Sequence, residues 1–263
     1  MGDWFLNLPV TWMALVVFGA TYLLSAGIHV FIMSLAKGDL RLAFKAVSPA
    51  MLSPLGVVFG LFVVFTAAQV WNDNERANTA VDQEASALRD VVILAATFPG
   101  EPEARLRALV RLYIEQAAQR EWPMMAQGIA SLRFTPAPLA EALQVALALA
   151  VSSEGQKAAQ RGMVTALESA FDARRQRVII SQSRVNPVKW LCLFVQAACA
   201  LFAIAMIHCD NRLASAIALW LFATGVAASV LLIAAHDRPF RGEISVGPEP
   251  LLQVMPEIQG KQP

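Results

Sequence analysis

The stretch of sequence that decides the fold runs from Ala46 to Asn72 and reads AVSPAMLSPLGVVFGLFVVFTAAQVWN. It contains no Asp, Glu, Lys or Arg. A helix needs roughly 20 apolar residues to cross the hydrocarbon core of a bilayer, at about 1.5 Å of rise per residue. A helix also satisfies its own backbone hydrogen bonds, which lipid cannot do. The stretch therefore predicts a membrane-spanning helix.

Three further stretches have the same character. These stretches are Val10–Ala36, Trp190–Cys209 and Leu213–Ala235. Each of them lacks charged residues and is long enough to span a bilayer. Charged residues make up only 16% of the 263 residues, against about 25% in an ordinary soluble domain. No Lys or Arg precedes the first stretch, which is also too long for the apolar core of a signal peptide, so we expect a retained helix. The sequence predicts an all-α integral membrane protein with four transmembrane helices.

Between the second and third stretches the periodicity is helical throughout, with no alternating strand pattern. We expect two helix pairs around a helical cytosolic domain, followed by a tail that its prolines keep extended. The predicted parts are residues 1–71 for the first pair (spans at about 10–36 and 47–71), 72–187 for the domain, 188–235 for the second pair (spans at about 189–209 and 213–235) and 236–263 for the tail.

The distribution of Lys and Arg near the span ends predicts the orientation. With four spans, the domain and both termini share one side of the membrane. That side carries the larger set of cations: Arg76, Arg89, Arg174, Arg175, Arg177, Arg184, Lys189, Arg238 and Arg241. The other side carries Lys37, Arg41, Lys45 and Arg212. We therefore expect a multi-pass membrane protein whose central domain and termini are cytoplasmic.

The sequence offers little chemistry for catalysis. It has no Gly-rich phosphate loop, no Cys-x-x-Cys pair and no His, Glu and Cys grouping with metal-ligand spacing. A net charge of +1 gives no sign of a nucleic-acid partner. We expect no enzyme activity, no cofactor, no metal and no nucleic acid. His29, inside the first span, is either a functional ionisable group or a neutral histidine bonded to a neighbouring helix.

The second span carries two patterns at helical spacing. Gly56 and Gly60 form a small-xxx-small face that allows close helix packing. Ser53, Val57 and Leu61, spaced by four, form another stripe. If this helix lined a pore, the stripe could form a hydrophobic constriction that gates by dewetting. A lipid-facing or helix-packing face has the same periodicity.

A basic cluster near the end of the domain also has two interpretations. Arg174, Arg175 and Arg177 lie close together in the last predicted helix of the domain. They form either a solvated face that contacts anionic lipid or an ion-pair network with Glu84 or Asp82 on the long second helix.

The run Pro54–Val63, followed by Val70-Trp71-Asn72, resembles the second helix of bestrophins. Those are pentameric chloride-permeable channels with four membrane helices per subunit and a helical cytosolic domain. In bestrophins three bulky apolar residues spaced by four narrow the pore, and the resemblance places these positions at Ser53, Val57 and Leu61. Ser53 departs from the pattern because it is small and polar.

A wider resemblance is to the bestrophin-like family of bacterial membrane proteins. It rests on Glu84-Ala85, Glu121-Trp122-Pro123, Arg174-Arg175-Gln176-Arg177, Pro187, Trp190 and the tail motif Asp237-Arg238-Pro239-Phe240-Arg241-Gly242-Glu243. The resemblance implies an oligomeric channel, pentameric if it follows bestrophins, in the inner membrane of a bacterium. Such a channel would pass inorganic anions. The alternative is a non-conducting, membrane-anchored scaffold or signalling protein whose cytosolic helices bind a partner.

Overall fold

The computed structural model of the chain describes residues 8–133 and 135–257, and within these ranges it contains helices and no strand. The chain divides into two compact units. Unit 1 comprises Met1–Asn72, Arg184–Asp237 and Gly242–Ile244, and unit 2 comprises Asp73–Ser183, Arg238–Arg241 and Ser245–Pro263. The all-helical class predicted from the sequence is confirmed.

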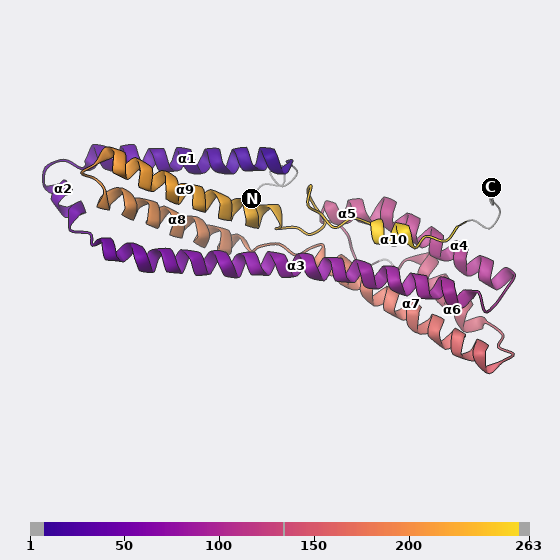
Figure 1. Cartoon of the computed structure of the whole chain (residues 1–263). Coiled ribbons are helices and arrows are strands. Elements are labelled where there is room, and N and C mark those ends of the chain that lie inside the picture. The colour runs from indigo at the N-terminus through magenta and orange to yellow at the C-terminus, as the bar shows by residue number, and fades with distance from the viewer. Residues whose placement is uncertain (1–7, 134, 258–263) are drawn as a thin grey trace. The chain divides into compact units, whose positions relative to one another are not determined.

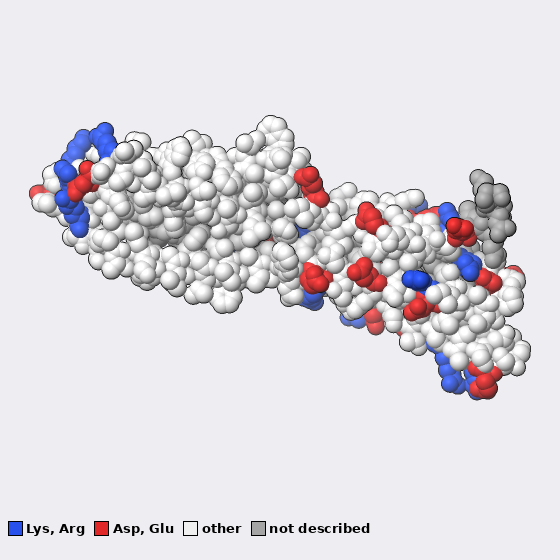
Figure 2. Space-filling view, viewed as in Figure 1, with Lys and Arg blue, Asp and Glu red and all other residues white. Residues whose placement is uncertain are grey.

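Unit 1 is built from long apolar helices. They are α1 (Val10–Leu35), the first half of α3 (Leu52–Ala95), α8 (Pro187–Ile207) and α9 (Arg212–Ala235). Each of the four is long and apolar enough to cross a membrane. The helices α1, α8 and α9 run alongside one another (Figure 1). On the face drawn in Figure 2, the length of unit 1 between its two ends shows no charged side chain, as a lipid-facing surface requires.

The connection between α1 and α3 contains a short helix that the sequence analysis did not predict. This helix, α2 (Gly38–Lys45), is followed by a 3-10 turn, η2 (Pro49–Met51). At the same end of unit 1, α8 and α9 are joined by a tight turn in which the Asn211 side chain caps α9 by accepting from the backbone N–H groups of Leu213 and Ala214.

Unit 2 is a bundle around the second half of α3. Its other helices are α4 (Glu101–Gln116), the π-helical turn η3 (Ala117–Glu121), α5 (Trp122–Ala126), α6 (Ala137–Ala148) and α7 (Glu154–Ile180). Gly100 precedes α4 with a φ of 97°, a conformation that favours glycine. Ser153 caps α7 through its hydroxyl, which accepts from the Gln156 N–H. The core between the helices is mainly aliphatic and includes Leu88, Leu106, Ile114, Leu139 and Leu167.

The tail is not extended over its described length, so that prediction was wrong in part. Residues Glu249–Gln253 form a single-turn helix, α10. Pro250 stands in its first turn, where a backbone N–H has no partner within the helix, so proline is tolerated. Before and within this turn, Phe240, Val246 and Leu251 are buried in the core of unit 2. The final residues 258–263 lie outside the described part of the chain.

Candidate functional site

The membrane part of α3 presents a face that no other described part of the chain covers. Val57 is 58% exposed and Leu61 is 52% exposed, and Ser53 on the same stripe is also exposed. In the most apolar part of this helix only 11% of the residues are buried, compared with 22%, 44% and 33% in α1, α8 and α9. The stripe therefore faces lipid or another molecule.

The glycine face of α3 is open as well. A Cβ atom added at Gly56 or at Gly60 would meet no atom of the described chain within 4 Å, outside the helix's own nearby backbone. None of the described helices is packed closely against these glycines. The two glycines are therefore open to lipid or to a close approach by another molecule.

The histidine inside the first span is hydrogen-bonded to a neighbouring helix. The Nδ1 atom of His29 on α1 lies 3.2 Å from the hydroxyl of Ser215 on α9. Ser215 is fully buried and His29 is partly buried. This geometry corresponds to the hydrogen-bonded interpretation of His29.

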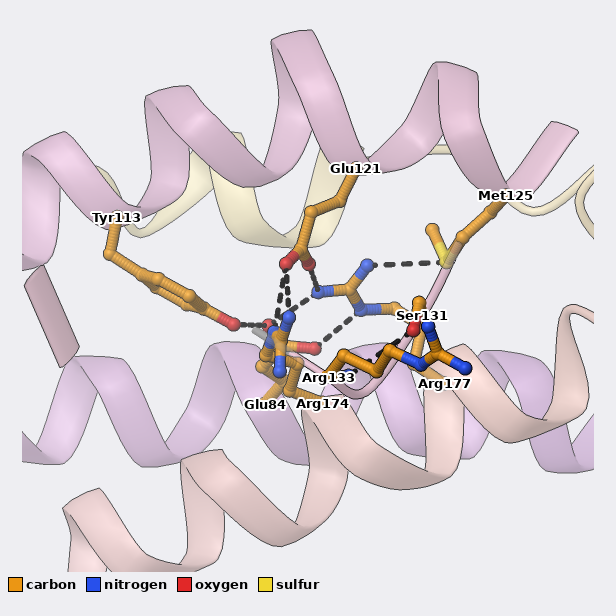
Figure 3. A network of polar contacts seen from close by, with 8 residues as sticks. All are labelled: Glu84, Tyr113, Glu121, Met125, Ser131, Arg133, Arg174 and Arg177. Atoms are coloured by element: carbon orange, nitrogen blue, oxygen red, sulfur yellow. Dashed lines mark hydrogen bonds and ion pairs between the residues drawn. The ribbon is translucent and has the colours of Figure 1, made fainter. Parts of the chain in front are cut away.

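Unit 2 contains a buried ion-pair network (Figure 3). Its central pair joins Glu84 on α3 to Arg177 on α7, with Arg177 Nε donating to Oε2 at 2.6 Å and Nη2 donating to Oε1 at 3.0 Å. Both side chains are fully buried. A bidentate pair of this kind is shorter and stronger than a neutral hydrogen bond, and it fixes the two helices relative to each other.

A second carboxylate extends the network. Glu121 accepts from Arg177 Nη2 at 3.0 Å and from Arg174 Nη2 at 2.5 Å. Two carboxylates thus face two guanidinium groups, so the buried charges balance. Such balance matters because an unpaired charge in a protein interior costs several kcal/mol.

Tyr113 on α4 completes the site by donating its hydroxyl hydrogen to Glu84 Oε1. Burial raises the pKa of Tyr113 well above its usual value, and the negative charge of Glu84 adds to the shift. The pKa of Arg177 is also raised, because the attraction of Glu84 and its neighbours outweighs the opposing effect of burial. At neutral pH Tyr113 is therefore a neutral donor and Arg177 a permanent cation.

The π-helical turn brings Tyr113 and Glu121 to the same site. The two residues are separated by eight positions, which in a regular α-helix would rotate one about 80° away from the other. The wider turn at Ala117–Glu121 lets the chain rotate less per residue, which offsets most of this difference. Both side chains consequently point toward Glu84 and Arg177 (Figure 3).

An aromatic platform lies beside the network and holds the tail. The guanidinium carbon of Arg177 lies 4.4 Å from the ring centroid of Trp122, within the range of a cation–π interaction. The indole N–H of Trp122 donates to the carbonyl of Val246 at 3.0 Å, and Phe240 packs edge-on against the same ring. The backbone carbonyl of Pro239 accepts from the Val246 N–H. The tail is thus fastened to the residue that supports Arg177.

The remaining residues of the tail motif have their own structural places. The carboxylate of Asp237, in unit 1, accepts from the backbone N–H of Val185 at 2.6 Å and is buried. Gly242 has a φ of 94°, a conformation that favours glycine. Arg238 follows Asp237 directly at the start of the unit 2 segment.

Of the arginine cluster noted in the sequence, the structure brings Arg177 to Glu84, while Arg174 contacts Glu121 instead. Arg175 and Asp82 are exposed and are not part of the network. The partnership of Glu121 and the role of Tyr113 were not foreseen from the sequence. The one sequence signal that pointed to Glu121 was the Glu121-Trp122-Pro123 motif. This motif is part of the resemblance to the bestrophin-like family, but the sequence alone does not indicate which residues it contacts.

Unit 2 also has an open groove of about 720 Å³ between α3 and α7. Polar and small side chains line it, among them Gln83, Asp90, Thr165, Ser169 and Asp172. No group of three or more His, Cys, Asp or Glu residues in the described ranges is arranged to hold a metal ion.

Long apolar helices in one unit and a charge-balanced helical bundle in the other define a helical integral membrane protein. The chain belongs to the bestrophin-like family, because the family model for the Bestrophin-like domain matches residues 19–251. Comparison with curated proteins found no match.

Several solved structures share the fold. A variant of a bacterial bestrophin homologue from Klebsiella pneumoniae aligns with a TM-score of 0.73 at 13% identity, over 90% of this chain and 96% of that one. A bestrophin homologue from the same organism, solved by Zn-SAD phasing, gives 0.70 at 14% identity, over 92% and 98%. A variant described only as a membrane protein gives 0.70 at 14% identity, over 90% and 94%. These likenesses establish the bestrophin fold.

Proposed function

We propose that this protein is a bestrophin-like oligomeric channel of the bacterial inner membrane, whose pore is lined by α3 and passes inorganic anions. The carrying observation is the exposed stripe of Ser53, Val57 and Leu61 on the least covered of the four apolar helices. A ring of copies, five in number if it follows bestrophins, would place this stripe around a central axis. Anion passage rests on the resemblance to chloride-permeable bestrophins.

The chemistry of the stripe suits a hydrophobic constriction. Val57 and Leu61 offer no group that could replace the water around an ion, so a narrow ring of them resists wetting. Ser53 adds a hydroxyl at the end of the stripe, where the constriction would be wider and less apolar. The open faces of Gly56 and Gly60 leave room for a neighbouring copy to approach.

The experiment compares ion flux through liposomes containing the parent protein and the double variant Val57→Ala/Leu61→Ala. Shorter side chains widen the constriction and lower its barrier, so the double variant should conduct more than the parent while assembling normally. The matched control is Leu15→Ala/Leu23→Ala on α1, whose residues are 62% and 76% exposed. The control should conduct like the parent.

The oligomeric state is measured on the same samples by mass photometry. A parent that is monomeric or dimeric contradicts the channel, because no ring surrounds the stripe. A ring that conducts no ion, either as the parent or as the double variant, makes the stripe a packing face. The scaffold alternative would then hold, with the groove between α3 and α7 as the first surface to test for a partner.

We also infer that unit 2 and both termini are cytoplasmic, because the larger set of Lys and Arg lies on that side of the predicted spans. A reporter that is active only inside the cell, fused after Pro263, should be active. An active export reporter at the same position would reverse the orientation.

A further inference from the structure

The short helix α2 lies where two apolar helices end. It follows the end of α1 at Leu35 and precedes the start of α3 at Leu52, so the chain connection alone keeps it near one surface of the bilayer. Leu40 is 51% exposed and Leu42 is 67% exposed. Only Phe44 of this helix packs against the core of unit 1. The helix therefore presents leucines to its surroundings at the membrane surface.

Cations gather around this helix. Lys37, Arg41, Lys45 and Arg212 outnumber the carboxylates of Asp39 and Asp210 at this end of unit 1. Figure 2 shows a group of Lys and Arg side chains, with acidic ones among them, at the end of unit 1 that lies next to its uncharged length. A helix with exposed leucines and an excess of cations has the composition of helices that lie in the plane of a membrane interface.

Asp210 contacts two of these cations. It accepts from Arg41 Nε at 2.6 Å and from Lys45 Nζ at 2.5 Å, and these contacts hold its pKa below its usual value, with the Lys45 contact contributing most. The side chains of Arg41 and Lys45 are nevertheless 51% and 49% exposed. Because exposed ion pairs are weak, a phosphate group can share or replace the carboxylate at these two cations.

We propose that α2 is an interfacial helix that binds the headgroup of an anionic phospholipid through Arg41 and Lys45, with Leu42, on the face away from Phe44, lying among the acyl chains. The exposed leucines favour a lipid over a free anion, because a free anion gains nothing from apolar neighbours. The excess of cations favours an anionic headgroup over a zwitterionic one. The site does not depend on whether the protein conducts ions.

The test measures lipid affinity with the purified full-length chain in detergent, by native mass spectrometry. The probes are phosphatidylglycerol, phosphatidylcholine and inorganic phosphate. The parent should retain phosphatidylglycerol in preference to phosphatidylcholine. Arg41→Gln/Lys45→Gln should weaken phosphatidylglycerol binding by at least about fivefold, the effect of one cation at an anionic surface.

Asp210→Asn supplies a test of opposite sign. Removing this carboxylate frees Arg41 and Lys45 from their competitor, so affinity for phosphatidylglycerol should rise above that of the parent. The matched control is Arg105→Gln in unit 2, since Arg105 is 52% exposed and pairs with Glu141 at 2.8 Å. This control should bind like the parent.

The leucines are tested separately. Leu42→Asn should weaken binding of both phospholipids, whereas Leu147→Asn, at a residue 61% exposed in unit 2, should not. Equal phosphatidylglycerol binding by the parent and by Arg41→Gln/Lys45→Gln would overturn the proposal, as would the absence of any gain in Asp210→Asn. Full displacement of phosphatidylglycerol by millimolar inorganic phosphate would also overturn it, by making α2 a simple anion site.

Discussion

Replacing Glu84 by Gln tests the buried network directly. The substitution keeps the size of the side chain and one acceptor oxygen, but it removes the charge that faces Arg177 at 2.6 Å and 3.0 Å. Breaking a fully buried ion pair costs about 3–5 kcal/mol. Arg177 keeps Glu121 at 3.0 Å, so we expect the lower end, about 3 kcal/mol. At about 2–4 °C per kcal/mol for a chain of this size, the apparent Tm should fall by roughly 6–12 °C.

The assay is thermal unfolding of the detergent-purified protein, followed by intrinsic tryptophan fluorescence. Glu141→Gln breaks an exposed pair with Arg105 and serves as the control, which should melt like the parent. The double variant Glu84→Leu/Arg177→Met removes both charges and should melt above Glu84→Gln, because no unpaired charge remains. A Glu84→Gln protein that melts with the parent would refute the stabilising role of the pair. A double variant that melts below Glu84→Gln would refute the argument from the unpaired charge.

Two further predictions concern the neighbours of Arg177. Because the pKa of Tyr113 is raised in the folded protein, its contribution to stability is complete below about pH 10, the unfolded pKa, and is lost as the pH rises through the folded pKa. The Tm of the parent should therefore fall more steeply between pH 9 and pH 11 than that of Tyr113→Phe, and parallel curves would contradict this. Trp122→Phe removes the donor to the buried Val246 carbonyl and should weaken the attachment of the tail by about 1–3 kcal/mol. Because the tail then detaches more often, tryptic cleavage after Arg241 should be faster. Trp220→Phe, at an exposed position, should be cleaved like the parent, and equal cleavage of all three proteins would show that the tail is held by other contacts.

The sequence predicts the four apolar helices well because lipid imposes a simple requirement. A long stretch without charges has one stable backbone structure in a bilayer, so α1, α3, α8 and α9 follow from composition alone. The sequence does not predict α2, because this helix is only eight residues long and mixes apolar and charged residues. The single turn of α10 does not follow from the sequence, because the prolines of the tail favour an extended chain, although the first turn of a helix tolerates proline.

The buried network was only half accessible from the sequence. A cluster of arginines and an acidic long helix indicate pairing, but they do not say which arginine faces which carboxylate. That choice depends on helix rotation: Arg174 and Arg177 lie on the buried face of α7, whereas Arg175 lies on its exposed face. Glu121 could not be placed in the network from the sequence, because regular α-helical spacing turns it away from Tyr113. No residue type in Ala117–Glu121 predicts the π turn that brings the two together.

The π turn has a consequence for how the length of this protein can vary. Most surface loops accept an added or lost residue, because the neighbouring helices keep their register. Within Ala117–Glu121 the loss of a single residue would let the chain return to α-helical winding, which would leave Tyr113 and Glu121 seven positions apart and only about 20° out of line. Arg177 would then keep both its second carboxylate and its aromatic neighbour. Among homologues, this short segment should therefore tolerate the loss of one residue, whereas the same length wound as a regular α-helix would turn Glu121 about 80° away from Tyr113.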